Sequence, residues 1–223
     1  MEFTRHADIK RLNFISGVLR KRLPEGAEVL DVGCGNGIIT RSLGEQGFHV
    51  RGIDVSAKAI EKAKSLNKLP NVQFENTSAE QLVADGRKYH AVICSEVLEH
   101  LNEPGKLLKV LHQVLQEDGV LIVTVPNGKG PRELFVTRPV IAMQKKNNWV
   151  WRSVKGIKKL FGYKGTTVQS DADDLTHIQF FTQRTLKQLA ADNSFEILTF
   201  RINGYLIVII FDLFQTVQDN RTQ

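Results

Sequence analysis

The sequence predicts an α/β protein built on a doubly wound, mostly parallel β-sheet. Short β-branched runs alternate with segments whose apolar residues recur at helical spacing, and a glycine-rich turn joins the first such run to the next helix. Alternating strands and helices imply right-handed crossovers and a sheet covered on both faces. The chain has 223 residues, 42% of them hydrophobic and 24% charged, which suits one globular core.

The first expected element is an amphipathic helix over Asp8–Leu23, which Pro24 and Gly26 bring to an end. Strands and helices then alternate without any repeat or low-complexity segment. The strands are expected at Glu28–Val32, His49–Ile53, Val72–Glu75, Ala91–Cys94 and Val120–Val125, and the helices at Ile39–Gln46, Ser56–Ser65 and Pro104–Leu115.

The last part of the chain adds a helix and further strand patterns. Thr182 suits the N-cap of a helix that runs to Asp192, and Phe195–Ile202 has the pattern of a strand. The mostly apolar run Tyr205–Phe214 fits either a buried final strand or a core helix. As a helix, it would leave the sheet one strand short, with an edge open to a second copy. We expect one domain over 1–223, made of an N-terminal helix (1–26), a core (27–127), a basic insertion (128–175) and a C-terminal part (176–223).

Positive charge is concentrated in one stretch. The formal net charge is +6, yet Lys129–Lys164 carries ten basic residues against the single acidic Glu133, which gives +9 in 36 residues and leaves −3 elsewhere. Aromatic side chains, among them Trp149 and Trp151, are interleaved with these cations. This mixture fits an anionic membrane surface or a phosphate-bearing partner, and equally a solvated insertion without a partner.

Composition excludes several classes of protein. The longest unbroken apolar stretch, Tyr205–Phe211, is far shorter than the roughly 20 residues that span a bilayer. Met1–Lys10 lacks the apolar core of a signal peptide, so we expect a cytoplasmic protein. Cys34 and Cys94 lie 60 positions apart at expected strand ends, which favours reduced thiols over a disulfide or a CxxC metal site.

Three glycines at alternate positions, Gly33, Gly35 and Gly37, follow the first expected strand. They let the backbone turn tightly and approach a ligand without a Cβ in the way. The sixth position counted from Gly33 is Ile38, which argues against a dinucleotide, and no Walker lysine follows the last glycine, which argues against a nucleoside triphosphate. The turn therefore predicts another nucleotide-like cofactor.

Asp54 ends the second expected strand, 21 residues after Gly33. A carboxylate there can accept two hydrogen bonds from a ribose diol, each worth about 1.5–3 kcal/mol because one partner is charged. The alternative is that Asp54 caps the helix that starts at Ser56.

In their order and spacing, these motifs resemble those of class I S-adenosylmethionine-dependent methyltransferases, most closely the ubiquinone-biosynthesis O-methyltransferase-like branch. They cover Val29–Asn127 and, more loosely, Thr176–Ile202. The resemblance implies the Rossmann-like class I methyltransferase fold, a cofactor-binding core at 27–127 and an insertion at 128–175 that covers the substrate. It implies S-adenosylmethionine as cofactor and S-adenosylhomocysteine as product. The cofactor contacts that it implies are Asp31, Gly33, Cys34, Gly35, Gly37, Asp54, Val55, Ser78, Ala79, Glu80, Cys94 and Ser95.

A turn rich in charge follows the fourth expected strand. If a helix starts there, Glu96, Glu99 and His100 share one face and need a positive charge between them. A divalent cation (magnesium, manganese, iron or zinc) would satisfy them, with His177 as a further ligand. The turn is similar to that of two metal-using branches, the ubiquinone-biosynthesis O-methyltransferases and the small-RNA 2′-O-methyltransferases. The alternatives are substrate positioning or proton removal without a metal, and a purely structural role.

The reaction that the resemblance implies is O-methylation, in which an acceptor oxygen attacks the sulfonium methyl group in line. His100 or His177, together with Glu99, would take up the acceptor's proton, or a metal would lower the pKa of the hydroxyl. Asn127, at the end of the fifth expected strand, either touches the acceptor or is only a turn residue.

Several acceptors fit this reaction. A lipid-linked quinol precursor would suit a protein docked peripherally on an anionic membrane through 145–164, and a small metabolite or glycan would suit a polar pocket. RNA is disfavoured, because the insertion has no recognisable RNA-binding motif and the rest of the chain is negative. An RNA 2′-O-methyltransferase and a non-catalytic cofactor-binding subunit are the alternatives to O-methylation of a small-molecule or lipid-linked acceptor.

Overall fold

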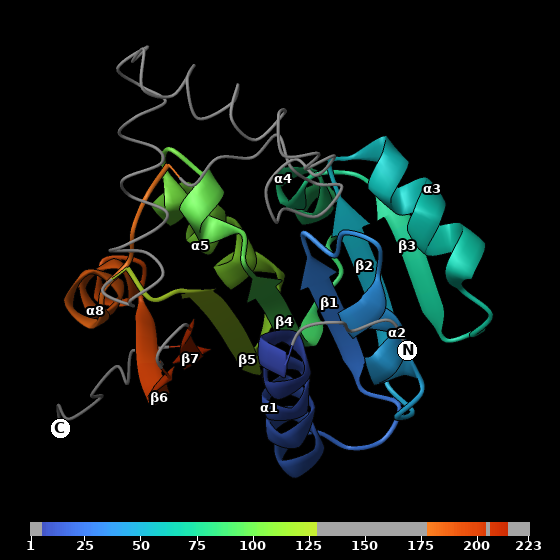
Figure 1. Ribbon diagram of the computed structural model, residues 1–223, viewed down its shortest axis with the longest axis horizontal. Helices are drawn as coiled ribbons and strands as arrows, with labels where there is room; N and C mark the ends of the chain where they lie inside the picture. Colours follow the sequence, from blue (N-terminus) through green and yellow to red (C-terminus); the bar gives the residue numbers. More distant parts are fainter. Residues whose placement is uncertain (1–5, 129–177, 204–205, 214–223) are drawn as a thin grey trace, which may run out of the picture.

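The computed structural model describes residues 6–128, 178–203 and 206–213, and these form a seven-stranded sheet in the order β3-β2-β1-β4-β5-β7-β6 (Figure 1). β1 to β5 run parallel, whereas β7 is antiparallel to both β5 and β6. The predicted doubly wound, mostly parallel sheet is confirmed. The strands are β1 (Glu28–Val32), β2 (His49–Asp54), β3 (Val72–Asn76), β4 (Tyr89–Ser95), β5 (Leu115–Pro126), β6 (Phe195–Asn203) and β7 (Leu206–Leu213).

Helices cover both faces of the sheet (Figure 1). On one face, Ile15 and Ile60 belong to a buried cluster formed with α1, α2 and α3, and on the other, Leu108 and Leu186 belong to a cluster formed with α4, α5 and α8. The apolar faces of these helices thus supply the two halves of the core. The helices are α1 (His6–Arg22), α2 (Ile38–Gly44), α3 (Ala57–Leu66), α4 (Ala79–Leu82), α5 (Pro104–Val114) and α8 (Gln183–Ala191), with short 3₁₀ helices η1 (Val83–Asp85) and η2 (Leu98–His100).

Most predicted elements appear with ends within two residues of those expected, but the start of β5 was wrong. The strand begins at Leu115, which pairs with Tyr89 before the register shifts, and not at Val120. Between Leu115 and Val120 lie the exposed residues Glu117 and Asp118, and these charged residues interrupt the apolar pattern by which a strand is recognised in the sequence. Pairing with β4 therefore overrides the local pattern.

The uncertain C-terminal run is a strand. β7 lies between β5 and β6 and pairs with β5 from Val120 opposite Asp212 to Pro126 opposite Leu206. The helix alternative, with its missing strand, is therefore wrong. β6 is therefore one edge strand of the sheet, and β3 is the other.

None of the helices in the described ranges is long and apolar enough to cross a bilayer. Apart from Gly128, the predicted basic insertion (128–175) lies outside the described residues, and so do the stretch 145–164 proposed for membrane docking and His177.

Candidate active site

The glycine turn forms the first part of the site, at the carboxyl end of β1. The backbone amides of Gly33 and Cys34 donate to the carbonyl oxygen of Ile53 at 2.9 and 3.0 Å, which ties the turn to the end of β2. Gly33, Gly35 and Gly37 have φ values of 70°, 54° and 74°, in the left-handed region that favours glycine. The turn therefore lies at the edge of the sheet where ligands bind in doubly wound folds.

Gly37 and Gly35 offer a matched pair of substitutions. A Cβ at Gly37 would overlap the buried ring of Phe74, whereas a Cβ at Gly35 would have no neighbour within 4 Å. Both alanines carry the left-handed strain of about 1–2 kcal/mol, and only Gly37→Ala adds overpacking. We expect Gly37→Ala to lower the free energy of unfolding by about 2 kcal/mol more than Gly35→Ala, as measured by urea denaturation. Equal losses in the two variants would mean that Phe74 moves aside.

The carboxylate of Asp54 faces the glycine turn. Its Oδ2 accepts a hydrogen bond from the Gly35 backbone amide at 2.9 Å, and its Oδ1 accepts one from the Ser56 amide at 2.8 Å. The N-cap of α3 is Ser56, whose hydroxyl accepts from the Ala59 amide, so the alternative of Asp54 as the helix cap is wrong. Asp54 is therefore free of a capping role and is held beside the turn.

The predicted contacts after β2 and β3 lie at the same edge of the sheet. Val55 follows Asp54 directly and is 76% exposed, a high value for an apolar side chain. Ser78 is the N-cap of α4, with Ala79 buried and Glu80 exposed in its first turn. The Asn76 side chain donates to the backbone carbonyl of Asp54 at 2.9 Å and joins the two strand ends.

Asp31 lies beneath the glycine turn. Its side chain is only 2% exposed, and its Oδ2 accepts a 2.6 Å hydrogen bond from the Thr40 hydroxyl of α2. Burial raises the pKa of Asp31 to about 7, although the Thr40 hydrogen bond lowers it. Asp31 therefore connects β1 to α2 and supports the turn from below, and direct contact with a cofactor stays a prediction.

Both cysteines are free thiols and lie near the strand ends. Cys94 is fully buried in β4, and Cys34 is half-buried in the turn, where its Sγ donates to the Gly35 carbonyl oxygen at 3.8 Å. Burial raises the pKa of both thiols well above the usual range, so they are neutral at physiological pH. Ser95, one residue further along β4, shares a hydrogen bond of 2.8 Å with the Thr124 hydroxyl of β5.

Glu96 follows β4 with a left-handed backbone, φ 59°. Its amide donates to the Thr124 carbonyl oxygen at 2.9 Å, and its carboxylate accepts from the Thr124 hydroxyl at 3.3 Å. A residue with a left-handed backbone cannot be one of the residues of a right-handed helix, and the 3₁₀ helix that forms here, η2, has three residues and begins only at Leu98. The expectation that Glu96, Glu99 and His100 share one helical face is therefore wrong.

Glu99 and His100 form a close pair within η2. The Glu99 side chain is 1% exposed and that of His100 is 18% exposed, with His100 Nε2 3.9 Å from Glu99 Oε1. The turn therefore places a buried carboxyl group directly behind an imidazole that still reaches the surface. A distance of 3.9 Å is longer than a hydrogen bond, so the carboxyl group can act on the imidazole through its charge when the imidazole is protonated.

The described residues do not fit the predicted metal centre. Within them, no group of three or more His, Cys, Asp or Glu side chains is placed to hold a metal ion. The fourth predicted ligand, His177, lies outside the described ranges. The described part of this turn therefore does not form the ligand set that a metal would need.

Arg11 of α1 is a site residue that the sequence reasoning missed. Its guanidinium Nη1 lies 3.7 Å from Glu96 Oε2, with the Arg11 side chain 16% exposed. Its charge offsets a small part of the rise that burial causes in the pKa of Asp31. Arg11 precedes Ile15 by four positions and Val18 by seven, so it falls on the apolar face of α1. A cation on that face was the signal that could have identified it.

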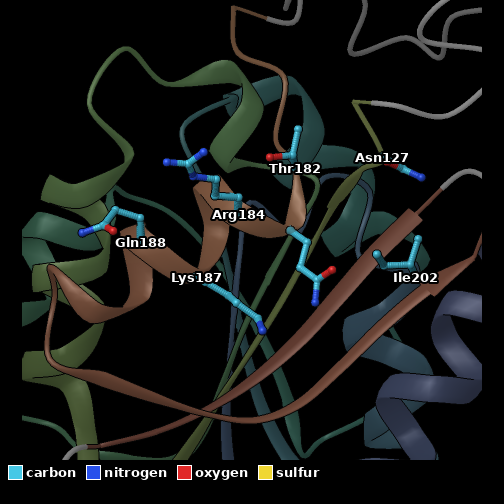
Figure 2. Close-up of a pocket in the computed structure, with 7 residues that line it drawn as sticks. Asn127, Thr182, Arg184, Lys187, Gln188 and Ile202 are labelled. Atoms are coloured by element: carbon cyan, nitrogen blue, oxygen red, sulfur yellow. The ribbon is translucent and has the colours of Figure 1, made fainter.

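A groove of about 720 Å³ opens between α8 and the carboxyl ends of β5 and β6 (Figure 2). Arg184 and Lys187 of α8 line it together with Asn127, which follows β5, and Ile202, a half-exposed apolar residue of β6. We call it the α8 groove. No acidic side chain is among the described residues that line it, so its character is cationic with an apolar wall.

A family model described as a methyltransferase domain matches residues 3–199 of the chain. The chain belongs to this methyltransferase family. The assignment to class I S-adenosylmethionine-dependent methyltransferases is thereby confirmed, since strand order, glycine turn and acidic strand end all agree with it.

Curated relatives of this methyltransferase include two ubiquinone biosynthesis O-methyltransferases. The protein of Paraburkholderia phytofirmans is 35% identical over 113 residues, which are 49% of each chain. That of Xylella fastidiosa is 36% identical over 121 residues, 52% of this chain and 48% of the relative. This methyltransferase thus spans about half the length of the curated relatives it matches.

Solved structures share the fold at lower identity. Magnesium protoporphyrin IX methyltransferase from Synechocystis, with bound S-adenosylhomocysteine, has a TM-score of 0.61 at 21% identity, covering 92% of this chain and 82% of its own. The Burkholderia thailandensis 1,6-didemethyltoxoflavin-N1-methyltransferase has a TM-score of 0.62 at 20% identity, covering 92% and 79%. The class I methyltransferase fold is therefore shown.

Proposed function

We propose that this methyltransferase transfers the methyl group of S-adenosylmethionine to a hydroxyl oxygen of a small-molecule or lipid-linked acceptor. The observation that carries the proposal is the 2.9 Å hydrogen bond from the Gly35 amide to the Asp54 carboxylate. It holds an acidic group at the rim of the glycine turn, where the ribose of an adenosyl cofactor needs a hydrogen-bond acceptor. The O-methyltransferases among its relatives support oxygen as the methylated atom.

The residues around the turn would hold the separate parts of the cofactor. An ionised carboxylate has about four lone-pair sites, so Asp54 can accept from the ribose hydroxyls in addition to its bonds with Gly35 and Ser56. The exposed Val55 side chain would pack on the adenine. Arg11 supplies a positive charge near Asp31 and Glu96 that suits the carboxylate of the methionine part.

In the proposed reaction, the acceptor oxygen attacks the methyl carbon while the carbon–sulfur bond breaks. The bonding pair stays on sulfur, so the thioether sulfur of the S-adenosylhomocysteine product is uncharged. The hydroxyl proton passes to His100, and the buried Glu99 carboxylate, 3.9 Å from its Nε2, would stabilise the imidazolium that forms. Holding the two reactants in line can supply about 7–11 kcal/mol of the barrier reduction. The α8 groove, with Asn127 at its rim, would receive the body of the acceptor.

Calorimetry with S-adenosylhomocysteine and a label-transfer screen test this proposal. We expect one product molecule bound per chain, and label from methyl-tritiated S-adenosylmethionine in hydroxylated aromatics such as catechol but not in the matched diamine 1,2-phenylenediamine. A chain that binds no S-adenosylhomocysteine would refute the proposal. Label in RNA alone would favour the 2′-O-methyltransferase alternative, and binding without any transfer would favour the non-catalytic subunit.

We expect transfer to survive removal of metal ions. Arg11 already places a positive charge 3.7 Å from Glu96, which is the role that a divalent cation would otherwise fill in the acidic turn. After dialysis against a chelator, turnover should equal that of the untreated protein, and added magnesium or zinc should not raise it. Activity that is lost on chelation and restored by one metal would instead show that the turn binds that metal.

We also propose that stretch 145–164 docks on anionic membranes and brings the protein to a lipid-linked acceptor. The support is the charge of +9 over Lys129–Lys164, interleaved with tryptophans. Changing Lys155, Lys158 and Lys159 to serine should weaken binding to phosphatidylserine vesicles about tenfold or more in cosedimentation, with neutral vesicles as the control. If neither protein binds either vesicle, the acceptor is delivered in solution.

A further inference from the structure

The residues that follow the insertion pack directly against the acidic turn. The backbone amides of Ile178 and Gln179 both donate to the carbonyl oxygen of Glu99, at 2.8 and 3.1 Å. In Figure 1, the orange segment that leads into α8 accordingly starts beside the green loop that precedes α5. Two parts of the chain about 80 positions apart therefore meet at the backbone of Glu99, which carries the carboxyl group of the proposed reaction.

Gln179 extends this contact with its side chain. Its Nε2 donates to the carbonyl oxygen of Leu101 at 2.7 Å and to that of Asn102 at 2.9 Å. These carbonyls close the end of η2, where a short helix leaves its last carbonyl groups without partners of its own. With its backbone and side chain, Gln179 thus donates hydrogen bonds to the carbonyl groups of Glu99, Leu101 and Asn102.

The same segment is fixed at its other end to β5. Phe181 is buried and forms a parallel bridge with Asn127, and the Gly128 amide donates to the Phe181 carbonyl oxygen at 2.9 Å. Gln179 therefore projects from a backbone that is anchored two residues further on. Because its backbone is fixed, the Gln179 side chain can hold the carbonyl groups of Leu101 and Asn102 in a defined position.

The backbone hydrogen bonds within the turn are of the 3₁₀ type. Glu96 enters it with a left-handed backbone, and its internal bonds are His100 amide to Val97 carbonyl at 3.0 Å and Leu101 amide to Leu98 carbonyl at 3.2 Å. Bonds of the 3₁₀ type have poorer geometry than those of an α-helix. The external bonds from Gln179 are therefore well placed to decide where Glu99 and His100 lie.

We propose that Gln179 is a positioning residue that holds the Glu99–His100 turn in the geometry needed for methyl transfer. This rests on the proposed function, because it assigns the held turn to that reaction. Gln179 touches neither the glycine turn nor Asp54 in the contacts described above. Its loss should therefore affect turnover and leave cofactor binding intact.

Three variants test the role. Gln179→Leu keeps the bulk of the side chain and removes the donor, Gln179→Lys restores donors with an ammonium group, and Gln113→Leu changes an exposed glutamine of α5 as the control. We expect Gln179→Leu to lower kcat for catechol methylation about tenfold, with unchanged KM for S-adenosylmethionine and unchanged calorimetric affinity for S-adenosylhomocysteine. Gln179→Lys should recover most of that loss, and Gln113→Leu should behave like the unaltered chain.

Amide hydrogen exchange provides a readout that needs neither cofactor nor acceptor. The amides of His100 and Leu101 should exchange several-fold faster in Gln179→Leu, while those of β1 and β4 keep their rates. Wild-type exchange in that variant, or wild-type kcat, would overturn the proposal. A parallel fall in cofactor affinity without rescue by lysine would also overturn it, because that pattern marks a general structural role. If the unaltered chain binds no S-adenosylhomocysteine, the proposed function fails while exchange still decides whether Gln179 holds the turn.

Discussion

Replacing Asp54 with alanine is expected to weaken binding of S-adenosylhomocysteine about a hundredfold, since loss of about 3 kcal/mol corresponds to two decades in affinity. The carboxylate would lose its charge-assisted bonds to the ribose hydroxyls, each worth about 1.5–3 kcal/mol. The Gly35 amide would also lose its 2.9 Å partner, so the glycine turn would become less ordered before the cofactor arrives. Isothermal titration calorimetry measures the change directly.

Two further variants separate these contributions. Asp54→Asn keeps a carbonyl oxygen that the Gly35 amide can use, but it removes the charge, so its affinity should fall between those of the alanine variant and the unaltered chain. Asp118→Ala removes an exposed carboxylate near the start of β5, at the opposite edge of the sheet, and should bind normally. If Asp54→Ala bound as tightly as Asp118→Ala, the ribose assignment would be lost.

The parts of the site that sequence could predict are those that local chemistry specifies. Glycines that need a left-handed backbone, and an aspartate that ends a strand, can each be recognised within a few residues of sequence. The structure places Gly35 and Asp54 in contact, in agreement with that pattern. Thr182 likewise caps α8 by accepting a hydrogen bond from the Thr185 amide, an arrangement visible in four consecutive residues.

The parts that sequence could not predict depend on distant partners. The left-handed backbone of Glu96 accompanies a hydrogen bond to Thr124 on the neighbouring strand, so helical spacing alone predicts the wrong geometry for the acidic turn. Arg11 reaches Glu96 only because α1 packs on the sheet. The run after Tyr205 could be recognised as a strand only from its pairing with β5 and β6.

These differences change the chemistry expected at the turn. With all of Glu96, Glu99 and His100 on one helical face, a metal was the natural way to balance their charge. With Glu96 beside Arg11, the remaining Glu99 and His100 form a pair of carboxyl group and imidazole, which is suited to proton transfer. The sequence indicated that the acidic turn needs a positive charge nearby. Arg11 of α1 supplies one beside Glu96.

Replacing His100 with glutamine should therefore lower kcat for methyl transfer by about 10²–10⁴-fold, the usual contribution of a positioned general base. Glutamine retains a polar side chain but cannot accept the hydroxyl proton of the acceptor, whereas the cofactor contacts at the glycine turn and Asp54 stay intact. Affinity for S-adenosylhomocysteine should be unchanged, so the loss falls on the chemical step. Steady-state kinetics with catechol measures the effect on kcat, and calorimetry measures the affinity for S-adenosylhomocysteine.

The matched control is His49→Gln, which alters an exposed histidine at the start of β2, away from the carboxyl edge of the sheet. It should leave kcat unchanged. Glu99→Gln should lower kcat less than His100→Gln, because the buried carboxyl group acts on the protonated imidazole through its charge and does not itself take the proton. Normal turnover in His100→Gln combined with a large loss in His177→Gln would move the role of base to the later histidine. The pair in η2 would then serve only to shape the turn that Gln179 holds.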